Sequence, residues 1–423
     1  MRNPDSSGPS ASSGYYGDEL ARLSQEGGVA FMNFQLAAAV PPHESSLPSP
    51  SNVREWQLKD ISRMKPQDQK EWRHVCHEEL DSLRKREVFE LVDLPKGRKT
   101  VRNRWVFDIK SDGRKKARLV AKGFSQVEGI DYNEIFSPVM RFETVHIMLA
   151  LAALQDWHIS ALDVKTAFLY GHLDEEIYLD QPQGFKAKGQ ETKVWRLKRA
   201  LYGLKQSALA WWKELESSMK KLGFKRLLTD AGAFIHEHQG KTVIAIIYVD
   251  DAMFFGNDKV LVTRKKKQIM DTWECRDLGE ASEFLCMRIK RKNSMIYIDQ
   301  VDYLDKVLKH FNMESASVAA TPLPAGWKPS ENKEEPDAKR RALYQSIIGS
   351  LLYIMLGTRP DICYAVTKLA QFASNPSQEH LDKAKYICRY LVGTCNYVLV
   401  YNGKTGKGIQ GYTDDVLSLV VAW

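Results

Sequence analysis

The spacing of apolar and polar positions predicts short strands mixed with helices. Between Trp56 and Arg86 apolar residues recur every three or four positions, which is typical of a helix that buries one face. Strands are expected in VFELVDLPKG (88–97), in RNRWVFDIKSDG (102–113), at HISALDV (158–164) and as a pair around Tyr248. Two helices are expected between them, near 143–155 and near 207–222. Strands and helices without strict alternation indicate an α+β fold.

The last third of the chain has a helical pattern. A polar stretch from Trp327 to Arg341 is interpreted as a linker. Three helices are expected after it, at 344–356, at 360 to about 374, and from an N-cap at Ser377 onward. The first 52 residues, rich in Ser, Pro, Gly and Ala, are expected to form a disordered lead.

Composition narrows the class of protein only a little. A length of 423 residues suits two or three domains, and a net charge of +8 weakly favours an anionic partner such as nucleic acid. The six cysteines include no CxxC pair, and no apolar run is long enough to span a membrane. We therefore expect an intracellular protein that is neither secreted nor membrane-bound.

Two adjacent acids interrupt the apolar stretch AIIYVDDAMFFG (245–256). On a strand pair, Asp250 would share a face with Tyr248, and Asp251 would point the other way or sit in the turn. The plain alternative is a hairpin turn that happens to use aspartate, a common turn residue. A third acid, Asp163, ends another apolar strand, and this second strand-end acid favours a shared pocket over the plain turn.

Acids gathered in this way need a cation. Two carboxylates about 4 Å apart repel by roughly 4 kcal/mol at an effective dielectric near 20. Either one of them stays protonated, or a divalent ion with oxygen ligands, usually magnesium, neutralises the group. Two such ions would support phosphoryl transfer. This hypothesis makes Asp163, Asp250 and Asp251 metal ligands.

Basic residues supply the matching charge for a phosphate-bearing substrate. Eleven lysines and arginines lie between Lys96 and Lys122, on a predicted strand–turn–strand segment. They either contact phosphates or form a solvated hairpin. The run KVWRLKRALYGLKQ (193–206) and the cluster 264–267 add basic surface, although the cluster is more simply explained as the solvated face of a helix.

Five motifs together resemble the reverse transcriptase of copia-type LTR retrotransposons. In order they are KARLVAKGFSQVEGIDYNEIFSPV (116–139), LDVKTAFLYGHLDEEIYLDQPQGF (162–185), WRLKRALYGLKQS (195–207), YVDDAMFFG (248–256) and DLGEASEFL (277–285). The later segments IGSLLYIMLGTRPDICYAV (348–366) and HLDKAKYICRYLVGT (380–394) look like the part of such polyproteins that joins the polymerase to RNase H. The resemblance covers about residues 70 to 415, and it implies a location in the cytoplasm, in a virus-like particle, or in the nucleus.

The resemblance implies an RNA-directed DNA polymerase with a right-hand fold of fingers, palm and thumb. Residues 53–325 would form this hand, 326–403 a helical connection, and 404–423 a truncated RNase H-like start in which Asp414 would be the first metal ligand. The partners implied are an RNA template, a DNA or RNA primer, dNTPs, and the RNase H and integrase segments of a parent Pol polyprotein. The alternative is an inert remnant that at most binds RNA or an RNA/DNA hybrid.

The resemblance also implies roles for single residues. Asp163, Asp250 and Asp251 would hold two Mg²⁺ ions, or Mn²⁺ in their place, with Asp163 and Asp250 the more direct ligands. Nucleotide-binding roles are implied as follows: Arg118, with Lys116 and Lys122 as weaker candidates, at the triphosphate; Phe168 against the sugar's 2′ carbon; and Gly203 or Gln206 beside the templating pair. For Phe168 taken alone, core packing is the simpler interpretation.

Two positions depart from the family's pattern. Leu209 stands where an arginine is usual, so a basic contact is expected to be lost. Cys286 stands where a glycine is usual, which would strain the backbone if this position needs a positive φ. The chain also ends at Trp423 without the remaining RNase H acids, so we expect no RNase H activity and a fragment of a larger polyprotein.

Overall fold

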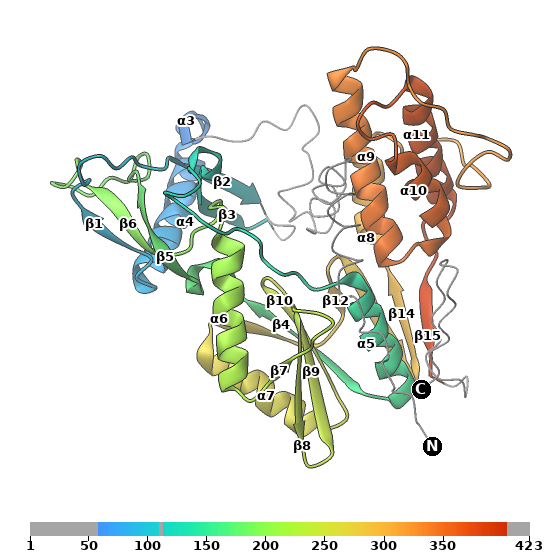
Figure 1. The fold of residues 1–423 in the computed structure, drawn as a ribbon, viewed down its shortest axis with the longest axis horizontal. Helices are drawn as coiled ribbons and strands as arrows, with labels where there is room; N and C mark the ends of the chain where they lie inside the picture. The colour runs from blue at the N-terminus through green and yellow to red at the C-terminus, as the bar shows by residue number, and fades with distance from the viewer. Residues whose placement is uncertain (1–57, 110–112, 404–423) are drawn as a thin grey trace, which may run out of the picture. The chain divides into compact units, whose positions relative to one another are not determined.

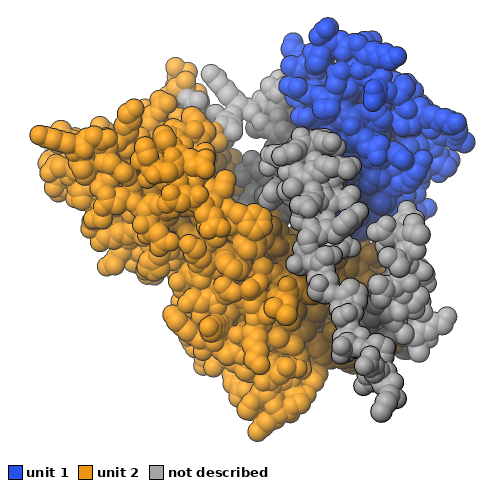
Figure 2. Space-filling model, viewed as in Figure 1, with its two compact units in different colours: residues 1–48, 300–397 blue, residues 49–299, 398–423 orange. Residues whose placement is uncertain are grey.

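A computed structural model of the chain describes residues 58–109 and 113–403. Contacts divide them into two compact units (Figure 2): unit 1 contains residues 300–397, and unit 2 contains the described residues up to Asp299 together with 398–403. The expected lead at 1–52 and the RNase H-like segment 404–423, with Asp414, lie outside the described residues. The boundary expected near residue 325 falls inside unit 1. No helix in the described ranges is long and apolar enough to cross a membrane.

Unit 2 mixes helices with antiparallel strands, as expected from the sequence (Figure 1). Its helices are α3 (Leu58–Ile61), α4 (Pro66–Lys85), α5 (Phe142–Gln155), α6 (Ser207–Lys221) and α7 (Lys259–Thr272). Its strands are β1 (Phe89–Val92), β2 (Asn103–Ile109), β3 (Lys115–Ala121), β4 (His158–Val164), β5 (His172–Leu179), β6 (Val194–Arg199), β7 (Lys225–Arg226), β8 (Ala233–His238), β9 (Lys241–Tyr248), β10 (Asp251–Gly256), β11 (Cys275–Glu280), β12 (Glu283–Phe284), β13 (Met287–Lys292), β14 (Met295–Asp299) and β15 (Leu399–Asn402).

The N-terminal part of unit 2 is built around α4. The predicted apolar spacing is confirmed, because Trp72, Cys76, Leu80 and Leu83 are all buried along this helix. Cys76, Leu80 and Leu83 join a core with residues of the hairpin β2–β3 and of the sheet β1-β6-β5. Since β2 and β3 form a two-stranded sheet, the outer edge of β3 has no neighbouring strand.

The largest described sheet of unit 2 has six strands in the order β11-β4-β10-β9-β8-β7. One of its faces is covered by α6 and α7, whose apolar residues share a core with Leu162 and Val164 of β4 and with Ala252 and Phe254 of β10. Residues with even numbers on β4 and β10 therefore face the helices. The odd-numbered residues between them, including Asp163 and Asp251, face the other way.

The predicted solvated face at 264–267 is wrong for two of its residues. Lys265 and Lys266 of α7 are only 6% and 3% exposed. The Nζ atom of Lys265 donates to the carbonyl of Leu222 at 2.7 Å, and that of Lys266 donates to Asp277 at 2.6 Å. Since both ammonium groups bind within the fold, neither is surface available to a nucleic-acid backbone.

Unit 2 also contains the four-stranded sheet β12-β13-β14-β15, and α5 packs against its β14 and β15. The strands β12 and β13 are joined by the two-residue turn Leu285–Cys286, because Phe284 pairs with Met287. Both turn residues have positive φ, +50° for Leu285 and +56° for Cys286. The strain predicted for the Cys286 backbone is confirmed, since a hairpin turn of this kind favours Asn-Gly.

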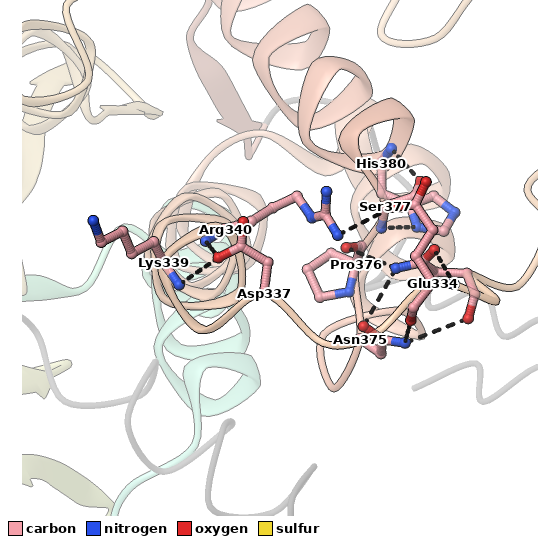
Figure 3. A network of polar contacts seen from close by, with 9 residues as sticks. Glu334, Asp337, Lys339, Arg340, Asn375, Pro376, Ser377 and His380 are labelled. Carbon is pink, nitrogen blue, oxygen red and sulfur yellow. Dashed lines mark hydrogen bonds and ion pairs between the residues drawn. The ribbon is translucent and has the colours of Figure 1, made fainter.

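Unit 1 is helical, as predicted, with α8 (Val301–His310), α9 (Ala338–Gly357), α10 (Cys363–Ala370) and α11 (Gln378–Gly393). Ser377 is the N-cap of α11, and its side chain and that of His380 form a capping box. The predicted linker is wrong at its end, because Asp337 accepts hydrogen bonds from the backbone of Lys339 and Arg340 and so begins α9 before residue 341 (Figure 3).

The rest of that linker is fixed to the turn before α11. Asn332 donates to Asn375 and to the carbonyl of Pro376, both at 3.3 Å, and Asn375 donates back to the carbonyls of Asn332 and Glu334 (Figure 3). Trp327 adds a bond from its indole nitrogen to Glu379 at 2.6 Å. The segment between α8 and α9 is therefore an ordered part of unit 1.

Candidate active site

Two of the predicted acids lie directly opposite each other in the six-stranded sheet. In the antiparallel register, Asp251 of β10 pairs with Asp163 of β4 on one side and with Tyr248 of β9 on the other. Residues directly opposite in an antiparallel pair share a face, with Cβ atoms about 5 Å apart. The three side chains form a row, on the face of the sheet away from α6 and α7.

The third acid, Asp250, sits in the turn that joins β9 to β10. Val249 and Asp250 form this two-residue turn, in which Val249 is left-handed with φ +55°. Trp211 holds the turn through an indole N–H bond to the Val249 carbonyl at 2.9 Å, and the Val164 amide donates to the Asp250 carbonyl at 2.7 Å. The expected placement of the pair is thus wrong: Asp250 occupies the turn, and Asp251 shares the face of Tyr248.

Burial and mutual repulsion raise the pKa values of two of these carboxyl groups. Burial, followed by repulsion from Asp250, Asp163 and Glu283, raises the pKa of the Asp251 carboxyl to about 7. Burial and then repulsion from Asp163 likewise raise the pKa of Asp250. A cation bound between these half-buried carboxyl groups would relieve their mutual repulsion.

The donor set fits a hard divalent cation, because carboxylate oxygens are the ligands that Mg²⁺ and Mn²⁺ prefer. In the described part of the chain, no three His, Cys, Asp or Glu side chains already stand together in an arrangement that could hold a metal ion. The register sets Asp163 opposite Asp251, and Asp250 precedes Asp251 in the turn, so these three aspartates are the residues that would hold the cation.

An aromatic pair adjoins the acids. Phe168, in the short 3₁₀ turn Ala167–Tyr170 after β4, meets Tyr202 edge to face with ring centroids 5.3 Å apart. Burial first, and the charge of Asp250 second, raise the pKa of Tyr202, which places this phenol near the turn acid. Phe168 is only half-buried, and it packs against the core that the sheet shares with α6 and α7.

Basic residues of the hairpin β2–β3 influence the charge of Asp250 in the same turn. Arg118 is 9% exposed, and its guanidinium lies 3.8 Å from the Asp108 carboxylate. Positive charges of Arg118 and Lys116 oppose the rise in the pKa of Asp250, so both cations lie within electrostatic range of it. Lys122 lies farther along, after β3, where its amide donates to the Arg102 carbonyl. Arg118 and Lys116, which belong to the first motif, thus lie within electrostatic range of the turn acid.

Gly203 and Gln206 have structural roles in addition to those implied. Gly203 has φ +87°, and a Cβ atom there would lie 2.2 Å from the Ala121 carbonyl oxygen, so only glycine fits against β3. Gln206 is buried and its amide group bonds Gln126, the Asp131 carbonyl and Glu175. Whether either one contacts a nucleotide stays a prediction.

A cavity of about 610 Å³ opens beside Gly203. Residues of β2, β3 and the following turn line it, among them Arg104, Lys122 and Phe124. Phe124, in the 3₁₀ turn Gly123–Ser125 that follows β3, is 77% exposed. An exposed aromatic ring in a cavity that cationic side chains also line is a surface on which a nucleic-acid base can stack.

Two charged residues beside these groups were missed in the sequence. Glu79 of α4 is buried, and its carboxylate accepts the Leu119 amide at 3.2 Å. It bonds the edge of β3 that lacks a strand, next to Arg118. Arg276 of β11 lies opposite Asp163 in the register. No sequence signal identifies Glu79, whereas Arg276 belongs to the segment before DLGE and could have been found from strand pairing.

The positions that depart from the motif pattern differ in their surroundings. Leu209 is 7% exposed in α6, where an apolar side chain suits the site. Cys286 carries the positive φ described above. The first replacement is thus compatible with packing, and the second leaves a backbone penalty.

Comparison with known proteins agrees with this geometry. The family model described as reverse transcriptase (RNA-dependent DNA polymerase) matches residues 86–325, more than half of the chain. A foamy viral protease-reverse transcriptase solved with double-stranded DNA covers 85% of this chain and 53% of its own at 14% identity, but its TM-score of 0.37 is too low to support an argument.

Curated relatives are Pol polyproteins of transposons. The chain is 39% identical to that of tobacco (Nicotiana tabacum) transposon TNT 1-94, over 80% of this chain and 26% of the polyprotein. It is 36% identical to that of Arabidopsis thaliana transposon RE1, over 81% and 24%. The putative transposon Ty5-1 protein of Saccharomyces cerevisiae is 32% identical, over 60% of this chain and 82% of its own length.

The chain thus spans about a quarter of the length of the two polyproteins it matches. The predicted α+β polymerase fold is confirmed by the observed elements together with the family match. The chain belongs to the reverse transcriptase (RNA-dependent DNA polymerase) family, in its copia-type transposon branch.

Proposed function

We propose that this chain is an RNA-directed DNA polymerase that adds deoxynucleotides to a primer on an RNA template. The single observation that supports this most is the register that sets Asp251 opposite Asp163, with Asp250 in the adjoining turn. In the reaction, the primer 3′ oxygen bonds to the α-phosphorus while the bond between that phosphorus and the α–β bridging oxygen breaks. The hydroxyl proton is lost to solvent, and pyrophosphate leaves.

The three aspartates are proposed as the ligands of two magnesium ions, or of manganese in their place. Divalent ions bound there supply activation of the attacking oxygen and neutralisation of the leaving phosphate. The chain's own contribution is a rigid platform: Asp163 and Asp251 are fixed by strand pairing, and Asp250 by the two backbone contacts of its turn. The raised pKa values of Asp250 and Asp251 are the energetic reason for a cation to bind.

Arg118 and Lys116 are proposed to bind the triphosphate. Both act electrostatically on Asp250, so a nucleotide at the acids is within range of their charges. Asp108 accompanies Arg118 at 3.8 Å in the structure, and the triphosphate would compete with it for the guanidinium. Lys122, on the rim of the neighbouring cavity, is proposed as a more distant contact.

Phe168 is proposed to select the sugar. Its ring lies in the turn after β4, five residues beyond Asp163, and packs edge to face against Tyr202. A ring fixed in this way excludes a 2′ hydroxyl by steric overlap, whereas a deoxyribose fits. The cavity beside Gly203 is proposed to take the templating nucleotide, with Phe124 stacking on its base.

Primer extension tests the proposal. We expect the full chain to extend oligo(dT) on poly(rA) with dTTP and Mg²⁺, and to stop when EDTA is added. Asp163→Asn and Asp250→Asn should each lower the rate by about 1,000-fold or more, because a metal ligand is lost. Asp271→Asn, an exposed position on α7, is the matched control and should leave the rate unchanged. Undiminished extension by Asp250→Asn would remove the proposed metal role.

The inert remnant is the second candidate, and the strained turn at Cys286 is the observation that favours it. A remnant would bind an RNA/DNA hybrid in a salt-dependent way and incorporate no nucleotide with any divalent metal. Templated extension that Asp163→Asn abolishes would exclude it. In the parent polyprotein, RNase H and integrase segments are the proposed neighbours of this chain.

A further inference from the structure

Arg276 of β11 extends the acid row by one strand. The register pairs Arg276 with Asp163, which in turn pairs with Asp251. Adjacent strands lie about 4.8 Å apart, so Arg276 stands one strand spacing from Asp163 and two from Asp251. A cation thus flanks the row on the side opposite to Tyr248.

The neighbours of Arg276 on its strand confirm which face it occupies. Cys275 packs against the core beneath α6 and α7. Asp277 accepts a hydrogen bond from the Lys266 ammonium of α7 at 2.6 Å. Because side chains alternate along a strand, Arg276 between them points to the opposite face, where Asp163 and Asp251 lie.

Arg276 is exposed, and its guanidinium has no bonding partner among the described residues. It makes no hydrogen bond or ion pair with any residue that the structure describes, Asp163 included. Nearby cations are used differently: Arg86 and Lys165 both bind Glu274, at 2.8 and 3.0 Å. Arg276 is therefore a charge that β11 presents on the acid face without an internal partner.

A row of aspartates repels any phosphate brought to it, and a cation at the end of the row reduces that repulsion. The charges of Arg118 and Lys116 act on Asp250, which lies in the turn next to the row. We propose that Arg276 binds a substrate phosphate group on the Asp163 side of the row. This inference rests on the proposed polymerase function, and the phosphate belongs either to the incoming triphosphate or to the backbone of the primer strand.

The test compares the full chain with Arg276→Gln, which removes the charge, and Arg276→Lys, which keeps it. The matched control is Arg264→Gln, an equal loss of charge at an exposed position on α7, across the sheet from the acid row. Two quantities are measured: the KM for dTTP in extension of oligo(dT) on poly(rA), and the salt dependence of equilibrium binding to that duplex without nucleotide.

If the phosphate is that of the nucleotide, Arg276→Gln raises the KM for dTTP about tenfold and leaves duplex binding unchanged. If it belongs to the primer backbone, Arg276→Gln weakens duplex binding about tenfold and lowers the salt slope by about one, with KM unchanged. In either case Arg276→Lys stays within about threefold of the wild type.

The inference is overturned if Arg276→Gln changes both quantities less than twofold, or if Arg264→Gln changes them as much. Duplex binding needs no turnover, so a wild type that binds but does not extend disproves the proposed function alone. In that case the role of Arg276 is tested by whether Arg276→Gln lowers the salt slope of duplex binding. A wild type that neither binds nor extends would disprove both claims.

Discussion

Replacing Asp251 by asparagine removes a negative charge that lowers the free energy of unfolding of the metal-free chain. The pKa of this carboxyl rises from 3.8 to about 7 on folding, so between these values the folded state binds more protons than the unfolded state. Stability then falls as the pH rises through that window, and the loss is complete above pH 7. Asp251→Asn lacks the charge and should therefore be more stable than the wild type at pH 8 when no divalent metal is present.

The size of the effect follows from the shift. About three pKa units correspond to about 4 kcal/mol at 1.36 kcal/mol each. Because the side chain is half-buried and solvent screens part of the repulsion, we expect about half of this, about 2 kcal/mol at pH 8 and less than about 1 kcal/mol at pH 5. Urea unfolding in EDTA, followed by tryptophan fluorescence, measures it, since Trp211 binds the turn itself.

Asp271→Asn is the control, because it removes an exposed carboxylate on α7 and should change the free energy of unfolding by less than about 0.5 kcal/mol at either pH. Equal stabilisation of Asp251→Asn at pH 5 and pH 8 would refute the electrostatic reasoning. Destabilisation at pH 8 would refute it as well, since it would show that the carboxylate contributes favourable contacts in the metal-free chain.

Three further changes test other parts of the account. Cys286→Gly should raise the free energy of unfolding by about 1 kcal/mol because it relieves the positive φ, and Cys286→Ala, which keeps that φ occupied by a side chain, should not. Gly203→Ala should lower the free energy of unfolding by about 3 kcal/mol or more, since the added Cβ atom would overlap the β3 backbone. Gly240→Ala is the control: its φ is positive but the space around it is open, so it should lower the free energy of unfolding by only about 1 kcal/mol in the same urea titration. Phe168→Ala should raise the ratio of ribonucleotide to deoxynucleotide incorporation about tenfold or more in primer extension, and an unchanged ratio would exclude the steric role.

Much of the fold could be predicted from the sequence because burial imposes a period. The apolar spacing of α4 and the mainly apolar stretch at His158–Val164 are local signals, and both elements appear where expected. The errors arise where tertiary contacts override such signals. Lys265 and Lys266 look solvated from their charge, and the pattern does not reveal that Asp277 and the Leu222 carbonyl are near enough to bind them.

The candidate site was predictable in its residue types but not in its geometry. Motif order identifies the acids, yet which of Asp250 and Asp251 occupies the turn depends on the strand register, which is a property of the whole sheet. Glu79 lies far from the motifs in sequence and reaches β3 only because α4 packs on it. Such residues are found once the pairing of distant segments is known.

Stabilisation by magnesium tests the central claim, a metal site made by Asp163, Asp250 and Asp251, most directly. The melting temperature of the full chain at pH 8 is measured as MgCl₂ is titrated in, for the wild type, for Asp250→Asn with Asp251→Asn, and for Asp271→Asn. Because binding to the folded state alone raises stability, we expect a rise of several degrees in the wild type and the control, and none in the double variant. An equal rise in the double variant would show that magnesium binds elsewhere and would contradict the account.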